Sequence, residues 1–284
     1  MEIIDNLDLT AYNSYRVYST VNKAFFPESE HELITVLKEN PHAIVIGGGC
    51  NIVFSKTHYD VPFIILRQNF SGIRQIGLNT LECLSGTSMS SVSLYALEKG
   101  LSGFELFYDI PGTVGGGVFM NAGAKGEDIA HLLQWVKVVD TESFEIKLFK
   151  TDEIGYDYRN SIFQDFSKYT ILSAAFILKV SDREGIREKM ENNKKERAKK
   201  QPREYPNAGS VFKRPEGFYV GAIIEDLNLK GTTIGDAQIS TKHGGFIINK
   251  GHATGNDIVE LINKTKKMID ETYNIDIQIE QRII

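Results

Sequence analysis

The chain is poor in cysteine and has no long hydrophobic run. Only Cys50 and Cys83 are present among 284 residues, and their spacing matches neither a metal-ligand pattern nor C-x-x-C. This argues against a disulfide scaffold and a cysteine-based zinc site. The longest apolar stretch, Ile171–Leu178, contains Ser173 and is too short to cross a bilayer. Because the N-terminus also lacks a basic segment followed by an apolar one, the sequence predicts a cytoplasmic protein without membrane contact.

Excess positive charge is also absent. Lys and Arg together number 32 against 37 Asp and Glu, for a formal net charge of −5. The chain therefore has no global attraction to nucleic acid. Its composition, with 42% hydrophobic and 24% charged residues, is that of a globular protein, and its length allows two or three domains.

Glycine is concentrated in the segment Ile110–Gly126, IPGTVGGGVFMNAGAKG, which holds six of the 25 glycines. Apolar residues such as Val114 and Val118 lie between them, whereas flexible linkers are polar and rich in serine. We therefore expect a partly buried loop that presents its backbone. Exposed amides in such a loop bind anionic groups, commonly the phosphates of a nucleotide or flavin.

Neither common phosphate motif fits this segment: no Gly-Lys-Ser/Thr follows it and no G-x-G-x-x-G can be placed in it. A second glycine cluster, Gly47–Asn51, directly follows the apolar run Ala43–Ile46. Alone it indicates a tight turn. Together the two clusters are able to hold the two ends of one large phosphate-containing ligand.

Hydrophobic periodicity predicts short strands alternating with helices. We expect helices at Glu28–Asn40, Met89–Lys99, Arg183–Arg203, Val220–Leu227 and Asp257–Tyr273. We expect strands at Ala43–Ile46, Phe63–Arg67, Leu81–Gly86, Val136–Asp140, Phe144–Phe149, Tyr169–Val180, Ala237–Ser240, Gly245–Asn249 and Ile275–Glu280. Interleaved acids in the charged helix favour a solvated linker over a nucleic-acid patch, and a domain boundary follows at Gln201–Pro202.

Two charged residues have open interpretations at this stage. Arg159 lies in the polar and aromatic segment Tyr156–Phe163 and is either a surface ion-pair partner or a fixed guanidinium that binds a carboxylate or phosphate. Glu280 lies in the predicted last strand, on the face opposite Ile275, Ile277 and Ile279. It therefore points either to solvent or into a cleft.

The motifs, taken in order, resemble one flavoenzyme family. They are Asn13-Ser14, Gly47–Asn51, Gly103–Glu105, Ile110–Gly126, Tyr158–Phe163, Asn207–Pro215, Lys242–Phe246 and Glu280–Ile284. Together they resemble the UDP-N-acetylenolpyruvoylglucosamine reductases. With no large insertion between Phe163 and Gln201, the chain is similar to the compact type that lacks an extra tyrosine-bearing loop.

The resemblance implies an α+β fold. It comprises a two-part FAD-binding domain of the vanillyl-alcohol-oxidase/PCMH type, with subdomains at 1–68 and 69–200, and a C-terminal α+β substrate-binding domain at 201–284. The implied FAD contacts are Gly47, Gly48, Gly49, Cys50, Asn51, Gly112, Thr113, Gly115, Gly116, Asn121, Ala122 and Gly123.

The implied chemistry is that of an oxidoreductase of peptidoglycan synthesis, and hence of cell shape and division. NADPH reduces FAD, and hydride then passes to the enolpyruvyl group of a UDP-linked amino sugar to give UDP-N-acetylmuramate. The family's catalytic positions fall on Arg159, Glu280 and Ser210, with Ser210 as the proton donor. Tyr158, Lys213 and Arg214 are implied substrate ligands. No metal is implied, and we expect a monomer.

Alternatives remain at this stage. One is a related FAD-dependent oxidase or dehydrogenase, although neither glycine cluster contains a histidine for covalent flavin attachment, and His58 and His243 lie outside both. Another is a non-catalytic flavin or nucleotide-binding module. Departures from the family pattern at Cys50, Asn228 and Asp236 leave room for a different substrate.

Overall fold

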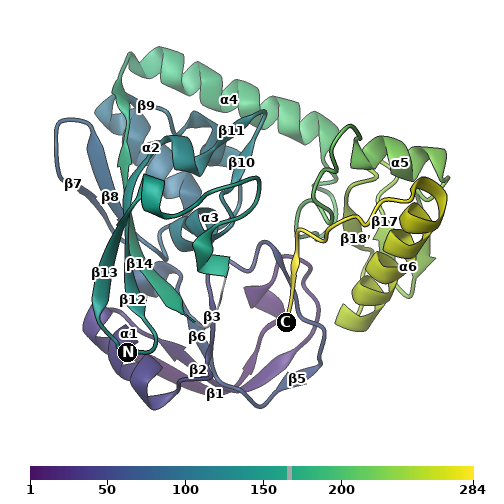
Figure 1. Ribbon diagram of the computed structural model, residues 1–284, viewed down its shortest axis with the longest axis horizontal. Coiled ribbons are helices and arrows are strands. Elements are labelled where there is room, and N and C mark those ends of the chain that lie inside the picture. The colour runs from purple at the N-terminus through teal and green to yellow at the C-terminus, as the bar shows by residue number, and fades with distance from the viewer. Residues whose placement is uncertain (165–167) are drawn as a thin grey trace. The chain divides into compact units, whose positions relative to one another are not determined.

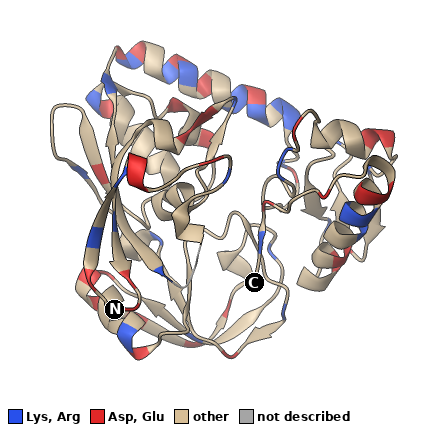
Figure 2. Ribbon diagram, viewed as in Figure 1, with Lys and Arg blue, Asp and Glu red and all other residues tan. Residues whose placement is uncertain are grey.

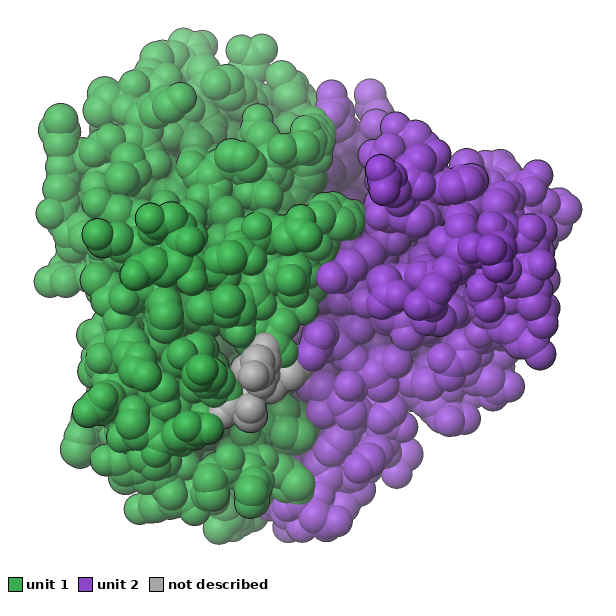
Figure 3. All heavy atoms as spheres, viewed as in Figure 1, with its two compact units in different colours: residues 1–5, 23–48, 61–195 green, residues 6–22, 49–60, 196–284 purple. Residues whose placement is uncertain are grey.

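The computed structural model describes residues 1–164 and 168–284 (Figure 1). The chain divides into two compact units that interleave along the sequence (Figure 3). Unit 1 comprises residues 1–5, 23–48 and 61–195, and unit 2 comprises residues 6–22, 49–60 and 196–284. Two early segments of the chain thus belong with its C-terminal third. The three-part division at residues 68 and 200 stays a prediction.

The first sheet of the chain is built around parallel strands. Its order is β1-β2-β6-β3, and β5 pairs with β2. The bounds are β1 Glu2–Asp8, β2 Thr20–Phe26, β3 Ile44–Ile46, β5 His58–Tyr59 and β6 Phe63–Ile65. Helix α1 (Glu30–Glu39) begins at Ser29, whose side chain accepts a hydrogen bond from the Glu32 N–H, and it buries Leu33, Val36 and Leu37.

A second, antiparallel sheet in unit 1 has the order β13-β12-β14-β8-β7. Its strands are β7 Ile73–Gln75, β8 Thr80–Leu84, β12 Leu133–Asp140, β13 Ile146–Lys150 and β14 Tyr169–Ile177. Helices α2 (Met89–Lys99) and α3 (Val114–Phe119) bury apolar side chains against it. As predicted, α2 ends at Gly100, which adopts φ 66°.

Short pairs complete unit 1. They are β9 (Leu101–Ser102) with β15 (Lys179–Val180), and β10 (Gly123–Ala124) with β11 (Glu127–Asp128). Single 3₁₀ turns lie at Thr10–Tyr12, Gln68–Phe70, Glu105–Asp109, Ile129–His131, Thr151–Glu153 and Ile162–Gln164.

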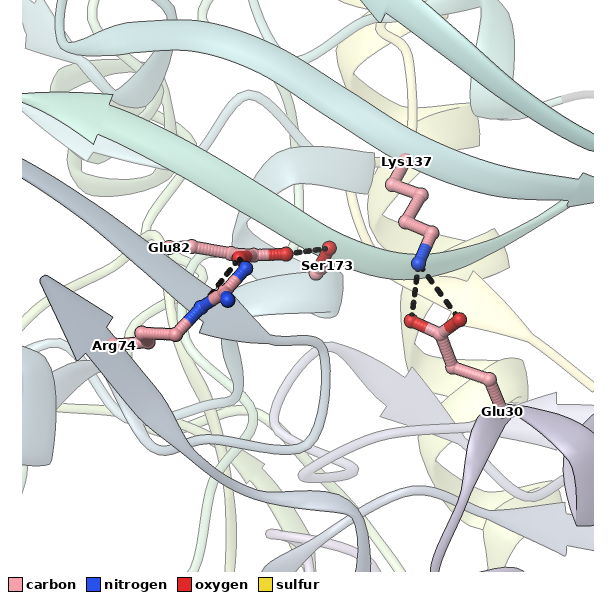
Figure 4. A network of polar contacts seen from close by, with 5 residues as sticks. All are labelled: Glu30, Arg74, Glu82, Lys137 and Ser173. Carbon is pink, nitrogen blue, oxygen red and sulfur yellow. Dashed lines mark hydrogen bonds and ion pairs between the residues drawn. The ribbon is translucent and has the colours of Figure 1, made fainter. Parts of the chain in front are cut away.

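The two sheets of unit 1 share a hydrophobic core. Leu33 and Val36 of α1 pack in one cluster with Val139 of β12 and Leu172 of β14. An ion pair adds to this contact, because Lys137 Nζ of β12 lies 2.7 Å from both carboxylate oxygens of Glu30 (Figure 4). The two sheets, and the loops that leave them, are therefore fixed relative to each other.

Unit 2 contains a three-stranded antiparallel sheet and two helices. The strands are β16 Thr233–Ile234, β17 Ala237–Ile239 and β18 Ile247–Asn249, and the helices are α5 Val220–Asp226 and α6 Gly255–Tyr273. Helix α6 begins with a capping box between Thr254 and Asp257 and packs on β16 and β17. The helix is confirmed, and of the six residues expected on its apolar face, Ile258, Leu261, Ile262, Thr265 and Ile269 are buried while Tyr273 is half-buried.

The charged segment forms helix α4 (Arg183–Lys200), with acidic and basic residues alternating along its length (Figure 2). Ile186 and Met190 are buried, and Ala198 is half-buried. Across residues 1–164 and 168–284, every helix is too short or too polar to traverse a lipid bilayer.

Two sequence predictions of secondary structure were wrong. The segment Ile110–Gly126 is not a continuous loop, because it contains helix α3 and strand β10. The predicted last strand, Ile275–Glu280, is extended chain with a single bridge at Ile279, and the regular strand is β19 (Arg282–Ile283), which runs parallel to β4 (Ile52–Val53). The alternation was right in part, since Ile277 is buried while Asp276 and Gln278 are exposed.

We predict that Asp140 makes unfolding sensitive to acid. Its carboxylate accepts hydrogen bonds from Lys147 Nζ at 2.6 Å and from the N–H groups of Glu142 and Ser143, which hold its pKa well below the usual range. A depressed folded pKa contributes stability above about pH 4 that is lost as the pH falls further. Asp140→Asn should therefore lower the melting temperature at pH 7, with a difference from wild type that narrows below about pH 4. Thermal unfolding between pH 3 and 7 tests this; a pH-independent difference would contradict it.

Candidate functional site

The first glycine loop, Gly47–Asn51, follows β3 and closely approaches two other segments. A Cβ on Gly47 would lie 2.4 Å from Thr113 Oγ1, in the second glycine segment. A Cβ on Gly49, which has φ 68°, would lie 2.0 Å from the Tyr12 carbonyl oxygen. Unit 1 therefore brings Gly47 and Thr113 of the two predicted cradles into contact, and only glycine fits at these positions.

The second glycine segment uses several of its backbone amides within the protein. The N–H groups of Val114 and Gly115 donate at 2.8 Å to the carbonyl oxygens of Thr87 and Ser85. The N–H of Gly117 donates to the Thr113 carbonyl at 2.8 Å. These amides do not face a ligand, so the expectation of a generally exposed backbone was wrong for this part of the segment. Its glycines serve close packing as well.

Gly116 is the exposed glycine of helix α3. A Cβ there would meet nothing closer than Thr113 Oγ1, at 3.6 Å, and its N–H lies 3.4 Å from the same oxygen. Helix α3 therefore has an open face at Gly116. Contact of this face with FAD stays a prediction.

Asn121 connects the second glycine segment to its surroundings. Its Nδ2 donates at 3.0 Å to Asp128 Oδ2 and to the Asp157 carbonyl, and its Oδ1 accepts from the Ala130 N–H at 3.3 Å. The residue is 2% exposed and has φ 44°. The Asn121 side chain is thus hydrogen-bonded within the protein. Contact of its backbone with FAD stays a prediction.

Arg159 is locked against the second glycine segment. It lies in a tight turn closed by hydrogen bonds between the backbones of Asp157 and Asn160, at φ 53°, a conformation that costs energy for a residue other than glycine. Its guanidinium donates to the carbonyl oxygens of Asn121, at 3.0 Å, and Gly123. A guanidinium held in this way is oriented before any ligand binds.

Tyr158 precedes Arg159 in the same turn and is exposed at its ring. Its N–H donates to Asp157 Oδ1 at 2.7 Å, and the centre of the Arg159 guanidinium lies 5.2 Å from its ring centroid. Unit 1 therefore holds Tyr158, Arg159 and the second glycine segment together.

In unit 2, the backbone brings Ser210 and Glu280 together. Ser210 forms an isolated bridge with Phe246, and Phe212 forms one with Ile279. Between them, the Val211 carbonyl accepts the N–H of Glu280 at 2.8 Å. Both Ser210 and Glu280 are half-buried. Glu280 is thus hydrogen-bonded to the residue that follows Ser210.

The end of the first glycine loop contacts the segment that carries Glu280. Asn51 Nδ2 donates to the Glu280 carbonyl at 3.1 Å, and the Arg282 N–H donates to the Asn51 carbonyl at 2.9 Å. This pairing continues as the parallel strands β4 and β19. A predicted cofactor residue and a predicted catalytic residue are therefore neighbours within unit 2.

The predicted substrate ligands Lys213 and Arg214 follow Ser210 on extended chain. The Lys213 N–H donates to the Gln278 carbonyl at 2.8 Å. The Arg214 guanidinium lies 3.7 Å from the Tyr219 ring centroid, and its Nε donates to the Phe218 carbonyl at 3.2 Å. The Arg214 guanidinium thus stacks over the exposed ring of Tyr219.

The departures from the family pattern have local structural reasons. Asn228 adopts φ 53°, which asparagine tolerates better than most residues and glycine adopts freely. Asp236 Oδ2 accepts the His252 N–H at 2.8 Å, and its carbonyl accepts the Lys250 N–H. Cys50 is half-buried, whereas burial raises the pKa of the Cys83 thiol to about 12.

Sequence reasoning missed Gln281 and Tyr15. Gln281 is 3% exposed and Tyr15 is fully buried, and the two side chains are joined by a 3.0 Å hydrogen bond. Both are polar residues inside unit 2, next to Glu280 and near the chain preceding Ser210. Gln281 lies in the Glu280–Ile284 motif, but nothing in the sequence marks its contact with Tyr15.

Two family models match the chain. The model described as UDP-N-acetylenolpyruvoylglucosamine reductase, C-terminal domain, matches residues 201–284. The model described as FAD binding domain matches residues 22–146. Together they include both glycine clusters, Ser210 and Glu280.

Full-length relatives carry the same name. UDP-N-acetylenolpyruvoylglucosamine reductase of Francisella tularensis is 39% identical over 98% of this chain and 99% of its own length. That of Petrotoga mobilis is 38% identical over 99% of this chain and 94% of its own length. The crystal structure of the reductase from Thermus caldophilus covers 99% of this chain and 98% of its own, with a TM-score of 0.82 and 27% identity.

We predict that Gly47→Ala weakens flavin binding. Its Cβ would lie 2.4 Å from Thr113 Oγ1 and would push the two glycine clusters apart. We expect the purified variant to retain less flavin, measured by visible absorbance, and the double variant Gly47→Ala/Thr113→Ala to recover part of it. Gly221→Ala is the control, since a Cβ there meets nothing within 4 Å. Full flavin content in Gly47→Ala would refute the prediction.

Proposed function

Because this chain belongs to the UDP-N-acetylenolpyruvoylglucosamine reductase family, we propose that Arg159, Ser210 and Glu280 act on the enolpyruvyl group of a UDP-linked amino sugar. The protein is an FAD-dependent oxidoreductase that uses NADPH to form UDP-N-acetylmuramate for peptidoglycan synthesis. The observation that supports the proposed roles is the Glu280 N–H to Val211 carbonyl bond, which joins the chain at Glu280 to the residue after Ser210. An oxidase or a non-catalytic module is not favoured, because the full-length relatives are named as reductases.

FAD would be held by the predicted residues of the two glycine clusters. The tight contact of Gly47 with Thr113 and the open face at Gly116 support this proposal. The chemistry that bound FAD supplies is hydride transfer from NADPH to the methylene carbon of the enolpyruvyl group.

Arg159 would bind the substrate carboxylate, or the negative charge that develops beside it. Hydride addition to the methylene carbon leaves enolate character on the neighbouring carbon and carboxylate, which a fixed cation stabilises. Because carbonyl oxygens of Asn121 and Gly123 already orient the guanidinium, little reorganisation is needed when that charge appears. Tyr158, in the same turn, would contact the substrate.

Ser210 would then donate a proton to the carbon that carries the enolate character. A serine hydroxyl is a weak acid, so it needs a neighbour that polarises it and an environment that excludes water. Glu280 would serve as the polarising or acidic partner. Lys213 and Arg214, which follow Ser210, would bind the diphosphate of the nucleotide through their positive charges.

We also propose that the protein is a cytoplasmic monomer that binds no nucleic acid, and the net charge of −5 supports the absence of nucleic-acid binding. We propose domains at 1–68, 69–200 and 201–284, and the match of residues 201–284 to a separate domain model supports the last boundary. Sedimentation of the purified protein tests the oligomeric state.

The activity is tested in two anaerobic steps. The purified enzyme is first reduced with NADPH, and the enolpyruvyl nucleotide is then added while flavin absorbance is followed. We expect the nucleotide to reoxidise the flavin in the absence of oxygen. If only oxygen does so, the substrate assignment is wrong.

We predict that Ser210→Ala separates the two steps. Reduction of the flavin by NADPH should stay near the wild-type rate, because no proton is needed from Ser210. Reoxidation by the nucleotide should slow by about 10²–10⁴-fold, the loss typical of a positioned acid. Stopped-flow absorbance measures both rates. Equal slowing of the two steps would show that Ser210 is structural.

A further inference from the structure

A buried polar contact involves the residues next to Ser210 and Glu280 in the sequence. Gln281 Nε2 donates to the carbonyl oxygens of Ala208 and Gly209, at 3.1 and 3.2 Å. Its Oε1 accepts from Tyr15 Oη at 3.0 Å. The Gln281 amide thus joins the residue after Glu280 to the two residues before Ser210.

The chemistry of the groups fixes the orientation of the amide. Carbonyl oxygens only accept, so the NH₂ group must face Ala208 and Gly209, and the oxygen must face Tyr15. The Tyr15 hydroxyl is then the donor, and its burial raises its pKa, so it remains protonated. Both Nε2 hydrogens are used and the hydroxyl is paired, which leaves Gln281 one allowed arrangement.

This arrangement orients the peptide group that leads into Ser210. The Gly209 carbonyl belongs to the peptide group that ends at the Ser210 nitrogen, and a peptide group is planar. Holding that carbonyl therefore fixes the plane from which the Ser210 side chain projects. Control is needed here, because Gly209 has φ 79° and a Cβ on it would meet nothing within 4 Å. The Gly209 N–H donates to Asn207 Oδ1 at 3.2 Å and Gln281 holds its carbonyl, so these two contacts fix a residue that packing does not.

The same residue also fixes Glu280. Gln281 follows Glu280 directly, and the Glu280 backbone is held by Val211 at its N–H and by Asn51 at its carbonyl. Tyr15 is anchored in turn, because Asn249 Nδ2 donates to its carbonyl at 2.8 Å. The Gln281 amide therefore ties the chain before Ser210 to the segment of Glu280, which Val211 and Asn51 also hold.

We propose that Gln281, anchored by Tyr15, is a positioning residue for proton donation by Ser210. The proposal rests on the function given above, in which Ser210 donates the proton. Gln281 touches neither substrate nor flavin in this role. Its effect is confined to the step that uses Ser210, whereas a general packing role would affect folding and both steps alike.

The test uses the full-length enzyme with bound flavin. Gln281→Met keeps the length of the side chain but removes its donors and its acceptor. We expect the rate of flavin reduction by NADPH to be unchanged, and the rate of reoxidation at saturating enolpyruvyl nucleotide to fall by about 10–100-fold, as small displacements of reacting groups do. Wild-type reoxidation at saturation would overturn the proposal, and so would equal slowing of both steps.

Tyr15→Phe provides a second variant that keeps the two donors of Gln281. It should slow flavin reoxidation by a smaller factor than Gln281→Met does and leave the rate of flavin reduction unchanged. In the Gln281→Met background, Tyr15→Phe should slow reoxidation no further, because the partner of the hydroxyl is already absent. Additive effects of the two substitutions would overturn the coupling.

Asn69→Leu is the matched control in unit 1. Asn69 makes the same three kinds of bond, from Nδ2 to the carbonyls of Pro27 and Ile65 and from the Arg67 N–H to Oδ1. It should lower the melting temperature and leave both rates unchanged. If the wild-type flavin itself is not reoxidised by the nucleotide, the proposed function fails; if it is and Gln281→Met behaves like Asn69→Leu, only the positioning role fails.

Discussion

Close approach of other chain segments to the backbone at glycine is the constraint on which the site depends. Segments far apart in sequence meet where one of them has no side chain, as Gly47 does at Thr113 and Gly49 at the Tyr12 carbonyl. At the start of α6, a Cβ on Gly255 would lie 1.7 Å from the Phe54 carbonyl oxygen. A single methyl group at any of these points would separate the segments. The glycines thus bring chain segments together before they bind anything.

This explains which parts of the fold were predictable. Helices α2 and α6 can be predicted from their local sequence, because each has a regular apolar face and a residue typical of a helix end, such as Gly100 or Thr254. The local sequence of helix α3 argues against a helix, because its three glycines have low helix propensity. It forms because Thr113 caps it and because Val114 and Val118 are buried in the core of unit 1. Such tertiary stabilisation is invisible in a local pattern.

The candidate site also has parts that the sequence predicted and parts that it did not. Arg159, Ser210 and Glu280 were found because they lie in recognisable motifs, and their catalytic roles stay predictions. Nothing in the sequence indicated that carbonyl oxygens of Asn121 and Gly123 orient Arg159. Nothing indicated the contact of Gln281 with Tyr15 across 266 positions either. Both contacts depend on which backbone carbonyls turn inward, and carbonyl direction follows from the fold rather than from residue type.

The interleaving of the two units has a consequence for biosynthesis. Residues 6–22 and 49–60 leave the ribosome early, yet they pack with residues 196–284, which leave it much later. Unit 1 has nearly all of its chain available while unit 2 still lacks most of its own, so the folding of unit 2 awaits long-range contacts. The early segments pair with each other, as the Ser14 N–H does with the Gly49 carbonyl, but Tyr15 and Asn51 meet Gln281 and Glu280 only once that later part of the chain is made. A nascent chain stalled before residue 280 would carry a formed first unit and a glycine loop only half supported.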